Sequence, residues 1–460
     1  MHKEEVAVPG IEKKVEKLLN PFQRFIADQT TSSKVLLLTT VVALAFANSG
    51  FAEQVYAGLH SMFGFAINDN LYQMSVLHWV NDGLMALFFL LLGMEIKREV
   101  LVGDLSSPSN LIPVLAAAAG GMFFPAIIFA TLNLGTPYIA GWGIPMATDT
   151  AFAVGILALL GSRAPLAAFS FLTGLAIIDD IGAIMVIAIF YTDSINALYI
   201  ALSAVLTALL FVLNYLGIRR PFWYLVIGVL LWLTVLSSGV HATIAGILIA
   251  AAIPARPKYK ASVMVERLAK VTQRFQRLVI NRGANQPVLA SKTQHQLADE
   301  LKITANQATT PLRRWEKLLH TPVGLLVLPI FAFSNAGVQL DASSLSSTLN
   351  STLAWGIFLG LVVGKGIGIP LMVWLTIKTG IGKLPQGLNM WHMVGLGMLG
   401  GIGFTMSIFI TGLGFAGDLA TQEIAKTAIL FTSLFAGVLG YILFKVAPSN
   451  KVKKGNQYAG

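Results

Sequence analysis

Long apolar runs separated by short polar connections dominate the chain. About twelve of these runs hold roughly 15 to 27 residues, and a helix needs about 20 residues to cross the roughly 30 Å of hydrocarbon in a bilayer. The pattern therefore predicts about twelve transmembrane helices. The predicted spans are residues 34–52, 77–96, 111–132, 138–160, 166–191, 196–216, 221–236, 239–255, 321–338, 352–376, 390–412 and 420–445.

The composition agrees with this pattern and removes several other classes of protein. Of the 460 residues only 12% are charged and 43 are glycine, whereas soluble domains carry about 25% charged residues. The mean hydropathy is +0.72. We therefore predict an all-α polytopic membrane protein. The chain has no cysteine, which excludes a disulfide framework, a thiolate nucleophile and a thiolate metal site.

Basic residues are confined to alternate connections between the predicted spans. The connections without Lys or Arg lie around residues 53–76, 133–137, 192–195, 237–238, 339–351 and 413–419. Because cytoplasmic connections carry the excess of Lys and Arg, this pattern predicts that both termini are cytoplasmic. The net charge of +10 is then a signal for topology and for anionic lipids, not for nucleic acid.

Polar segments divide the chain into parts. Residues 1–33 form a charged N-terminal segment without a signal-peptide cleavage pattern, so we expect it to stay in the cytoplasm. Spans one to eight occupy residues 34–255, and spans nine to twelve occupy residues 321–445. Residues 256–320 form a long basic cytoplasmic loop between them, and residues 446–460 form a cytoplasmic tail.

The stretch SVMVERLAKVTQRFQRLVI in this loop predicts an amphipathic helix. Its apolar face repeats every three or four residues, with basic residues elsewhere, and consists of Met264, Leu268, Val271, Phe275 and Leu278. Such a helix lies on the anionic leaflet or packs against the protein. A regulatory element is the alternative, and nucleic-acid binding is not favoured.

Four ionisable residues lie deep in predicted spans: Asp149, Asp179 and Asp180, and Lys365. An isolated charge at the bilayer centre costs roughly 3 kcal/mol on insertion scales, so such residues line a cavity or pair with one another. Adjacent helical positions point about 100° apart. One of the two neighbouring aspartates can therefore contact a partner helix while the other lines a cavity.

These residues suit ion exchange. Burial and neighbouring charges alter how tightly a carboxylate holds its proton. A carboxylate that can hold either a proton or an alkali cation makes the two compete for one site, which is sufficient for exchange. The alternative is an ion pair between one aspartate and Lys365 that only holds helices together.

Glycine and proline interrupt the fourth and eleventh spans, in GWGIPMATDT and GLGMLGGIGFTMS. Non-helical backbone at membrane depth survives only where it is buried or lines a polar cavity. Matching interruptions in two halves indicate inverted-topology repeats, here spans three to five and ten to twelve. If the broken helices cross, Asp149 can balance the two positive helix ends and Lys365 the two negative ends.

Six motifs in order resemble the bacterial NhaA sodium/proton antiporters, from about residue 30 to 445. They are ATDTAFAVGILALLGSRAP, AIIDDIGAIMVIAIFYT, SGVHATIAG, LPIFAFSNAGV, GKGIGIP and GGIGFTMSIFI. The resemblance implies an electrogenic carrier of the inner membrane, not an enzyme, that exports Na+ or Li+ for a larger number of protons. It implies no cofactor beyond the transported ions.

The resemblance also implies roles for the buried residues. Asp180 matches the principal cation-binding carboxylate of the family, and Asp179 matches a neighbour that pairs with the lysine matched by Lys365. Thr148 and Asp149 match the Thr and Asp of the broken fourth helix, so Na+ is expected at Asp180 with help from Thr148.

Further matches concern regulation by pH and assembly. Residues matching a pH-sensing region are Glu95, Arg98, Glu316 and His320, with His241 at the outer end of the eighth span; for each histidine a plain hydrogen-bonding role is the alternative. Lys317 stands where some members have a second His, and the long loop before Glu316 is a second departure. Asp82 matches an acid of the second helix. Members also form homodimers, helped by an external hairpin for which residues 53–75 have room.

Two other functions compete with exchange. A sodium-coupled symporter of the same fold would move an organic solute with sodium. An intramembrane aspartyl protease also needs two membrane acids, and Asp149 and Asp180 could be imagined in that role. Protease chemistry leaves Lys365 and both broken helices unexplained, and the Gly-x-Gly-Asp signature is absent from the sequence.

Overall fold

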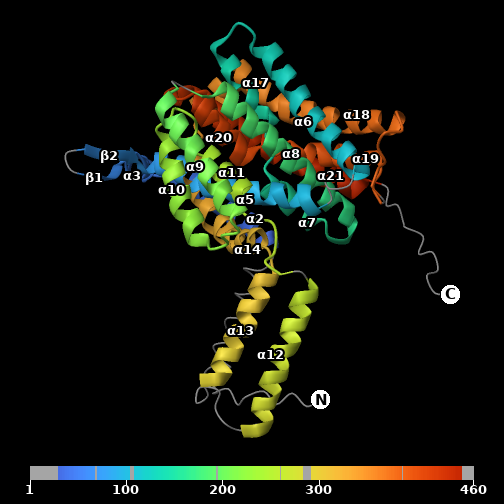
Figure 1. The fold of residues 1–460 in the computed structure, drawn as a ribbon. Coiled ribbons are helices and arrows are strands. Elements are labelled where there is room, and N and C mark those ends of the chain that lie inside the picture. Colours follow the sequence, from blue (N-terminus) through green and yellow to red (C-terminus); the bar gives the residue numbers. More distant parts are fainter. Residues whose placement is uncertain are drawn as a thin grey trace, which may run out of the picture.

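The computed structural model describes residues 29–67, 70–103, 108–192, 195–259, 261–282, 292–385 and 387–447. The predictions for most of the N-terminal segment, for the C-terminal tail and for the middle of the 256–320 loop lie outside these ranges. Within them the chain is almost entirely helical, and its helices pack into one bundle from which two hairpins project (Figure 1).

Seven helical stretches of the described chain are long and apolar enough to cross a membrane. Three of them contain a short π-helical segment, labelled η1, η6 or η7. The stretches are α4–η1–α5 (Val76–His78, Trp79–Leu84, Met85–Val102), α6 (Pro108–Asn133), α8 (Leu166–Phe190), α9 (Ala197–Tyr215), α14–η6–α15 (Pro311–Pro322, Val323–Val327, Leu328–Asn335), α17–η7–α18 (Thr352–Leu359, Gly360–Gly364, Lys365–Lys378) and α21 (Leu419–Val446).

The remaining predicted spans are bent or short. Bent pairs are α2 (Gln29–Ala47) with α3 (Ala52–His60), the 3-10 helix η3 (Pro137–Met146) with α7 (Thr150–Leu159), and α19 (Met390–Gly400) with α20 (Phe404–Gly414). The two short helices are α10 (Pro221–Leu236) and α11 (Ile244–Ala252). Each of the twelve predicted runs overlaps a helix or a helix pair, but by length and composition the described chain has seven spans, or up to ten if each bent pair is one span. The all-α membrane fold is confirmed.

The two predicted interruptions are real breaks. The chain bends by 44° between η3 and α7 and by 46° between α19 and α20. Proline at position 145 lacks a backbone donor, and the glycines at 400, 401 and 403 favour leaving the helix. The breaks touch, since the backbone N of Asp149 donates to the carbonyl of Ile402 at 2.6 Å. Helix α20 packs against η3, and α19 packs against α7. The inverted repeat itself stays a prediction.

Close backbone approaches place Lys365 beside these breaks. A Cβ added to Gly368 would lie 2.5 Å from the carbonyl oxygen of Gly120, so α18 and α6 meet backbone to backbone. A Cβ added to Gly397 would lie 2.7 Å from the carbonyl oxygen of Lys365. Glycine is required at such contacts because any side chain would push the helices apart.

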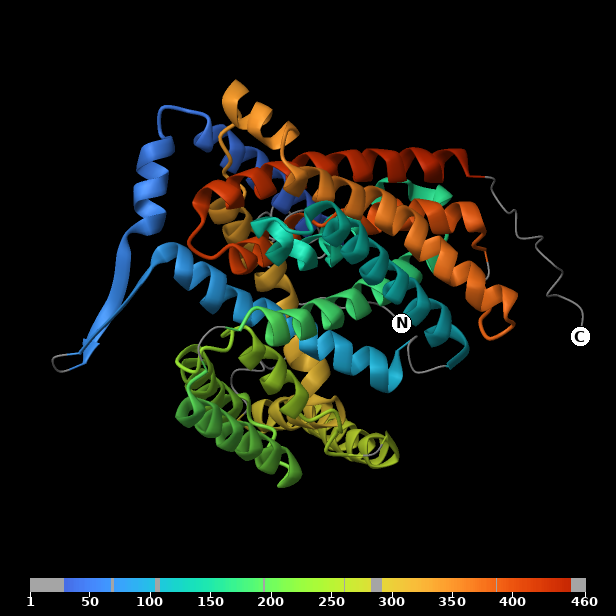
Figure 2. The ribbon, with the colours of Figure 1, turned by 90° about the horizontal axis from the view of Figure 1, so that it is seen from above.

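A β-hairpin stands out from the side of the bundle (Figure 1 and Figure 2). It consists of β1 (Met62–Ile67) and β2 (Asn70–Ser75), paired antiparallel from Met62 opposite Ser75 to Ile67 opposite Asn70. Helix α3 leads into it from the first span. The hairpin implied by the resemblance is therefore present, and its role in a homodimer stays a prediction.

The long loop contains two helices, α12 (Ala261–Arg282) and α13 (Lys292–Ala308), which pack together and extend away from the bundle beside α14 (Figure 1). The predicted amphipathic helix is confirmed: its apolar face is the less exposed side of α12, with Val271 3% exposed. This face packs against protein. Shorter helices lie elsewhere in the connections, at Gly161–Arg163 (η4) and Ala342–Leu349 (α16).

Candidate ion-translocation site

Asp149 joins the N-terminal ends of α7 and α20, which are the second halves of the two broken spans. As the N-cap of α7 it accepts a hydrogen bond from the backbone N of Phe152 at 3.1 Å. Its other carboxylate oxygen accepts from the backbone N of Thr405 at 3.0 Å and from the Thr405 hydroxyl at 2.5 Å. A carboxylate is favourable near the partial positive charge of helix N-termini, and here one carboxylate serves two of them.

Lys365 also lies at the breaks, but on the side where the first halves of the broken spans, η3 and α19, have their C-terminal ends. Its ammonium donates to the carbonyl of Ala147, at the end of η3, at 2.9 Å, and to the Thr148 hydroxyl at 2.6 Å. It also pairs with Asp179 Oδ2 at 3.3 Å, with both side chains fully buried. The lysine therefore touches one helix C-terminus directly and an aspartate at the same time.

Thr148 connects this group to the second broken helix. Its hydroxyl lies 2.7 Å from Asp179 Oδ2 and 3.0 Å from the carbonyl of Gly400, at the end of α19. A hydroxyl donates one proton only, so it donates to one of these acceptors while accepting from Lys365. The pair formed by Asp179 and Lys365 thus has a polar link to both helix C-termini.

Asp180 faces a different environment from its neighbour. It lines a cavity of about 530 Å³, together with Thr148 and Asp149. Its side chain is 4% exposed, and its Oδ1 atom has no hydrogen-bond partner. Buried polar atoms without partners are rare. Asp179 Oδ1 also lacks a hydrogen-bond partner among the described residues, but Asp179 Oδ2 is held by Thr148 and Lys365, and Asp179 does not line the cavity. Asp180 is therefore the one of the two buried carboxylates that faces the cavity.

Four of the predicted pH-sensing residues line the same cavity: Glu95, Arg98, Glu316 and His320. Arg98 Nε pairs with Glu316 Oε1 at 2.8 Å. Asp179 and Lys365 are not among the lining residues. The cavity therefore connects the α14 region with Asp180 and leaves the lysine pair behind its wall.

A second cavity of about 440 Å³ lies near the base of the β-hairpin, at Ser75, and shares no described lining residue with the first cavity. It contains Asp82 and His241. Asp82 pairs with His78 at 2.8 Å, and His241 Nε2 lies 2.5 Å from the carbonyl oxygen of Tyr191. His241 is thus separated from the other predicted pH-sensing residues. Helix α20 lies between the cavities, with Met406 on one and Ile408 on the other.

Comparison with known proteins identifies the family. The model of the family described as Na+/H+ antiporter 1 matches residues 23–444. The chain belongs to this family. It is 45% identical over 440 residues to the Na(+)/H(+) antiporter NhaA of Oleidesulfovibrio alaskensis, covering 95% of this chain and 97% of that protein. It is 43% identical to Na(+)/H(+) antiporter NhaA 2 of Psychromonas ingrahamii, covering 96% and 93%.

Membership confirms the resemblance seen in the motifs. The chain is a multi-pass membrane protein of a bacterial antiporter family, and it is a transporter rather than an enzyme. The intramembrane protease considered from the sequence is therefore excluded. The roles of the individual site residues are not tested by membership and stay predictions.

Sequence reasoning missed two partners of the site. Thr405 follows Gly403 at the start of α20 and holds Asp149; a Thr after a glycine-rich break is a helix-start signal that could have indicated it. His78 stands four residues before Asp82 on the same helical stretch, a spacing at which side chains meet.

Proposed function

We propose that this protein exchanges cytoplasmic Na+ or Li+ for external protons by alternating access at Asp180. The observation that carries the proposal is the environment of that residue: a buried carboxylate with one unpartnered oxygen lines a cavity, next to the pair of Asp179 and Lys365. The relatives named above are Na(+)/H(+) antiporters, which supports Na+ and protons as the exchanged ions.

In this mechanism Na+ reaches Asp180 through the first cavity and displaces its proton. Oxygens near the carboxylate complete the coordination, among them the Thr148 hydroxyl, because alkali cations prefer oxygen ligands. Binding shifts Thr148 and so weakens the contacts of Lys365, which releases a second proton from the lysine or from Asp179. The site then closes to the first cavity and opens to the second, where protons replace Na+.

Exchange of two protons for one Na+ moves one net charge inward. A membrane potential then contributes about 2.3 kcal/mol per 100 mV to each cycle. In this proposal the switch rearranges the short segments at the two breaks, which contact each other through the backbone of Asp149 and Ile402. The Arg98–Glu316 pair at the first cavity is our candidate for the element that responds to pH.

The proposal also covers the membrane, the orientation and the assembly of the protein. The first cavity lies on the side of the basic α12–α13 hairpin, so we place that side in the cytoplasm of a bacterial inner membrane, with both termini there. A homodimer formed through the β-hairpin and contact with anionic lipids belong to the same proposal.

The test is the pH change that Na+ produces inside respiring inverted membrane vesicles, followed with a pH-quenched dye between pH 6 and 9. We expect dequenching with Na+ or Li+ and none with the Asp180→Asn variant. Asp341→Asn, which changes an exposed aspartate at the start of α16, is the matched control and should behave as wild type. Sodium movement coupled to an organic solute, without a pH change, would favour the symporter instead.

A further inference from the structure

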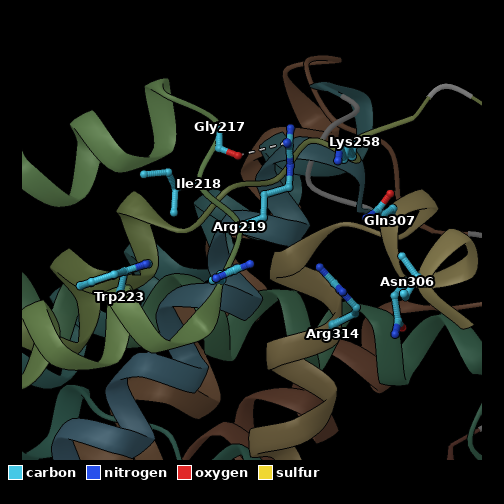
Figure 3. A pocket seen from close by; sticks show the side chains of 10 residues that line it. Gly217, Ile218, Arg219, Trp223, Lys258, Asn306, Gln307 and Arg314 are labelled. Atoms are coloured by element: carbon cyan, nitrogen blue, oxygen red, sulfur yellow. Dashed lines mark hydrogen bonds between the residues drawn. The ribbon is translucent and has the colours of Figure 1, made fainter. Parts of the chain in front are cut away.

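A cationic pocket lies outside the transport path. It has a volume of about 610 Å³ and collects four basic side chains, and none of the described residues that line it is acidic. Figure 3 shows Arg219 on one side and Lys258 with the amides of Asn306 and Gln307 on the other, with Arg314 below them. The fourth basic residue, Arg220, follows Arg219 in the chain.

The pocket is assembled from four separate parts of the fold. Arg219 comes from the α9–α10 connection, Lys258 from the segment before α12, Gln307 from the end of α13, and Arg314 from α14. The backbone N of Lys258 donates to the carbonyl of Gln307 at 2.9 Å, which ties the segment to α13. The long loop therefore supplies one wall of the pocket.

Within the described part of the chain, no ion pair joins the basic side chains of the pocket to an acidic one. Arg314 Nε is buried without a hydrogen-bond partner, and Arg219 and Arg314 lie close enough to repel each other. Arg219 is only held by backbone carbonyls, those of Gly217 at 3.2 Å and Arg256 at 3.4 Å. Guanidinium groups left with free donors in this way match a phosphate, which accepts two parallel hydrogen bonds from each fork.

We infer that this pocket binds a phosphate-bearing anion. The amides of Asn306 and Gln307 add donors, and Trp223, Ile218 and Ile303 form an apolar wall. The volume lies within the roughly 300 to 1,000 Å³ of small-ligand sites, so the ligand carries an apolar or aromatic part beside the phosphate. A soluble nucleotide and the headgroup of an anionic phospholipid share this chemistry.

A ligand bound in the cationic pocket affects the transport path through α14. Arg314 stands two residues before Glu316, which lines the first cavity and pairs with Arg98. A bound phosphate clamps α14 to α13 and the α9–α10 connection, and it cancels positive charge near the cavity. Because positive charge repels Na+, occupancy lowers the Na+ concentration that gives half-maximal exchange. This coupling rests on the proposed function; the binding itself does not.

Binding is measured first, by titration calorimetry on the full-length purified protein in about 0.15 M salt, where the Debye length is about 8 Å. Soluble probes are ATP and inorganic pyrophosphate; lipid probes are mixed micelles of phosphatidylglycerol against phosphatidylcholine. Arg314→Gln and Arg219→Gln should each weaken binding by about tenfold, since each removes charge-assisted hydrogen bonds. Arg274→Gln, an exposed arginine on α12 outside the pocket, should leave binding unchanged.

The results of these titrations identify the kind of ligand or exclude the site. Pocket-dependent binding of ATP or pyrophosphate assigns a soluble ligand, and pocket-dependent binding of phosphatidylglycerol alone assigns a headgroup. No binding of any probe, or equal weakening by Arg274→Gln, overturns the site. Arg314→Gln should also lower the half-maximal Na+ concentration without ligand and abolish any effect of ligand; an unchanged Na+ dependence with binding intact overturns the coupling alone.

Discussion

Thr405 makes two hydrogen bonds to one oxygen of Asp149, through its backbone N at 3.0 Å and its hydroxyl at 2.5 Å. The start of α20 is thereby tied to the break before α7. Thr405→Val keeps the side-chain shape and removes the hydroxyl, so we expect the free energy of unfolding to fall by about 1 to 3 kcal/mol. Thermal unfolding in detergent measures this, and Thr405→Ser should restore most of the loss. Equal stability of the Val and Ser variants would contradict the contact.

Replacing each of the two adjacent aspartates by asparagine should change the stability of the protein differently. Asp179→Asn leaves the buried ammonium of Lys365 without its anionic partner, and breaking a buried pair costs about 3–5 kcal/mol. Asp180→Asn removes a carboxylate whose Oδ1 has no partner, so unfolding should occur at or above the wild-type temperature. Thermal unfolding of both variants under identical conditions separates them. A similar loss in both would show that Asp180 is also a structural anion.

The Arg98–Glu316 pair should govern the pH profile of exchange as one unit. Because the two side chains contact each other at 2.8 Å, Arg98→Gln and Glu316→Gln should shift the pH of half-maximal exchange, and the double variant should shift it no further than either. Lys302→Gln changes an exposed lysine on α13 that does not line the cavity and is the control. Additive shifts in the double variant would show that the residues act separately.

The N-cap of α21 should give a dependence of stability on pH. Hydrogen bonds from the Thr421 hydroxyl and backbone N hold the pKa of Asp418 below its usual range. A lowered pKa means that this stabilisation is complete above the unfolded-state value, about 3.9, and is lost as pH falls through the folded-state value. The difference in melting temperature between wild type and Asp418→Ala should therefore shrink from pH 7 toward pH 3. A constant difference would contradict a role for the charged cap.

The sequence predicted the breaks and the buried charges because both rest on local rules. Glycine and proline interrupt helices wherever they occur, and a charge inside an apolar run needs a partner at any depth. These two rules were sufficient to select Asp149, Asp179, Asp180 and Lys365.

Which aspartate faces the lysine could not be predicted from the sequence alone, since the rotation of α8 depends on packing. Contacts such as Gly120 against Gly368 place α18 beside α6 and bring Lys365 to Asp179. The resemblance supplied this pairing instead. The separation of His241 from Glu316 into different cavities, and the cationic pocket, likewise depend on contacts between segments far apart in the chain.

The Lys365→Gln variant distinguishes a lysine that carries a proton from one that only holds helices together. In the proposed cycle Lys365→Gln removes one proton carrier, so one Na+ exchanges for one proton and the potential no longer contributes its roughly 2.3 kcal/mol per 100 mV. Charge movement in proteoliposomes on a solid-supported membrane should then disappear while Na+-driven pH changes persist at a reduced rate.

Stability must be separated from transport in this experiment, because Asp179 would lose its partner. The double variant Asp179→Asn with Lys365→Gln removes both buried charges and should recover stability while remaining non-electrogenic. Lys378→Gln is the control, because Lys378 is the exposed last residue of α18, the helix that carries Lys365, and lines neither cavity. Full electrogenic exchange by Lys365→Gln would show that the second proton travels on another group, and Asp179 would be the first to test.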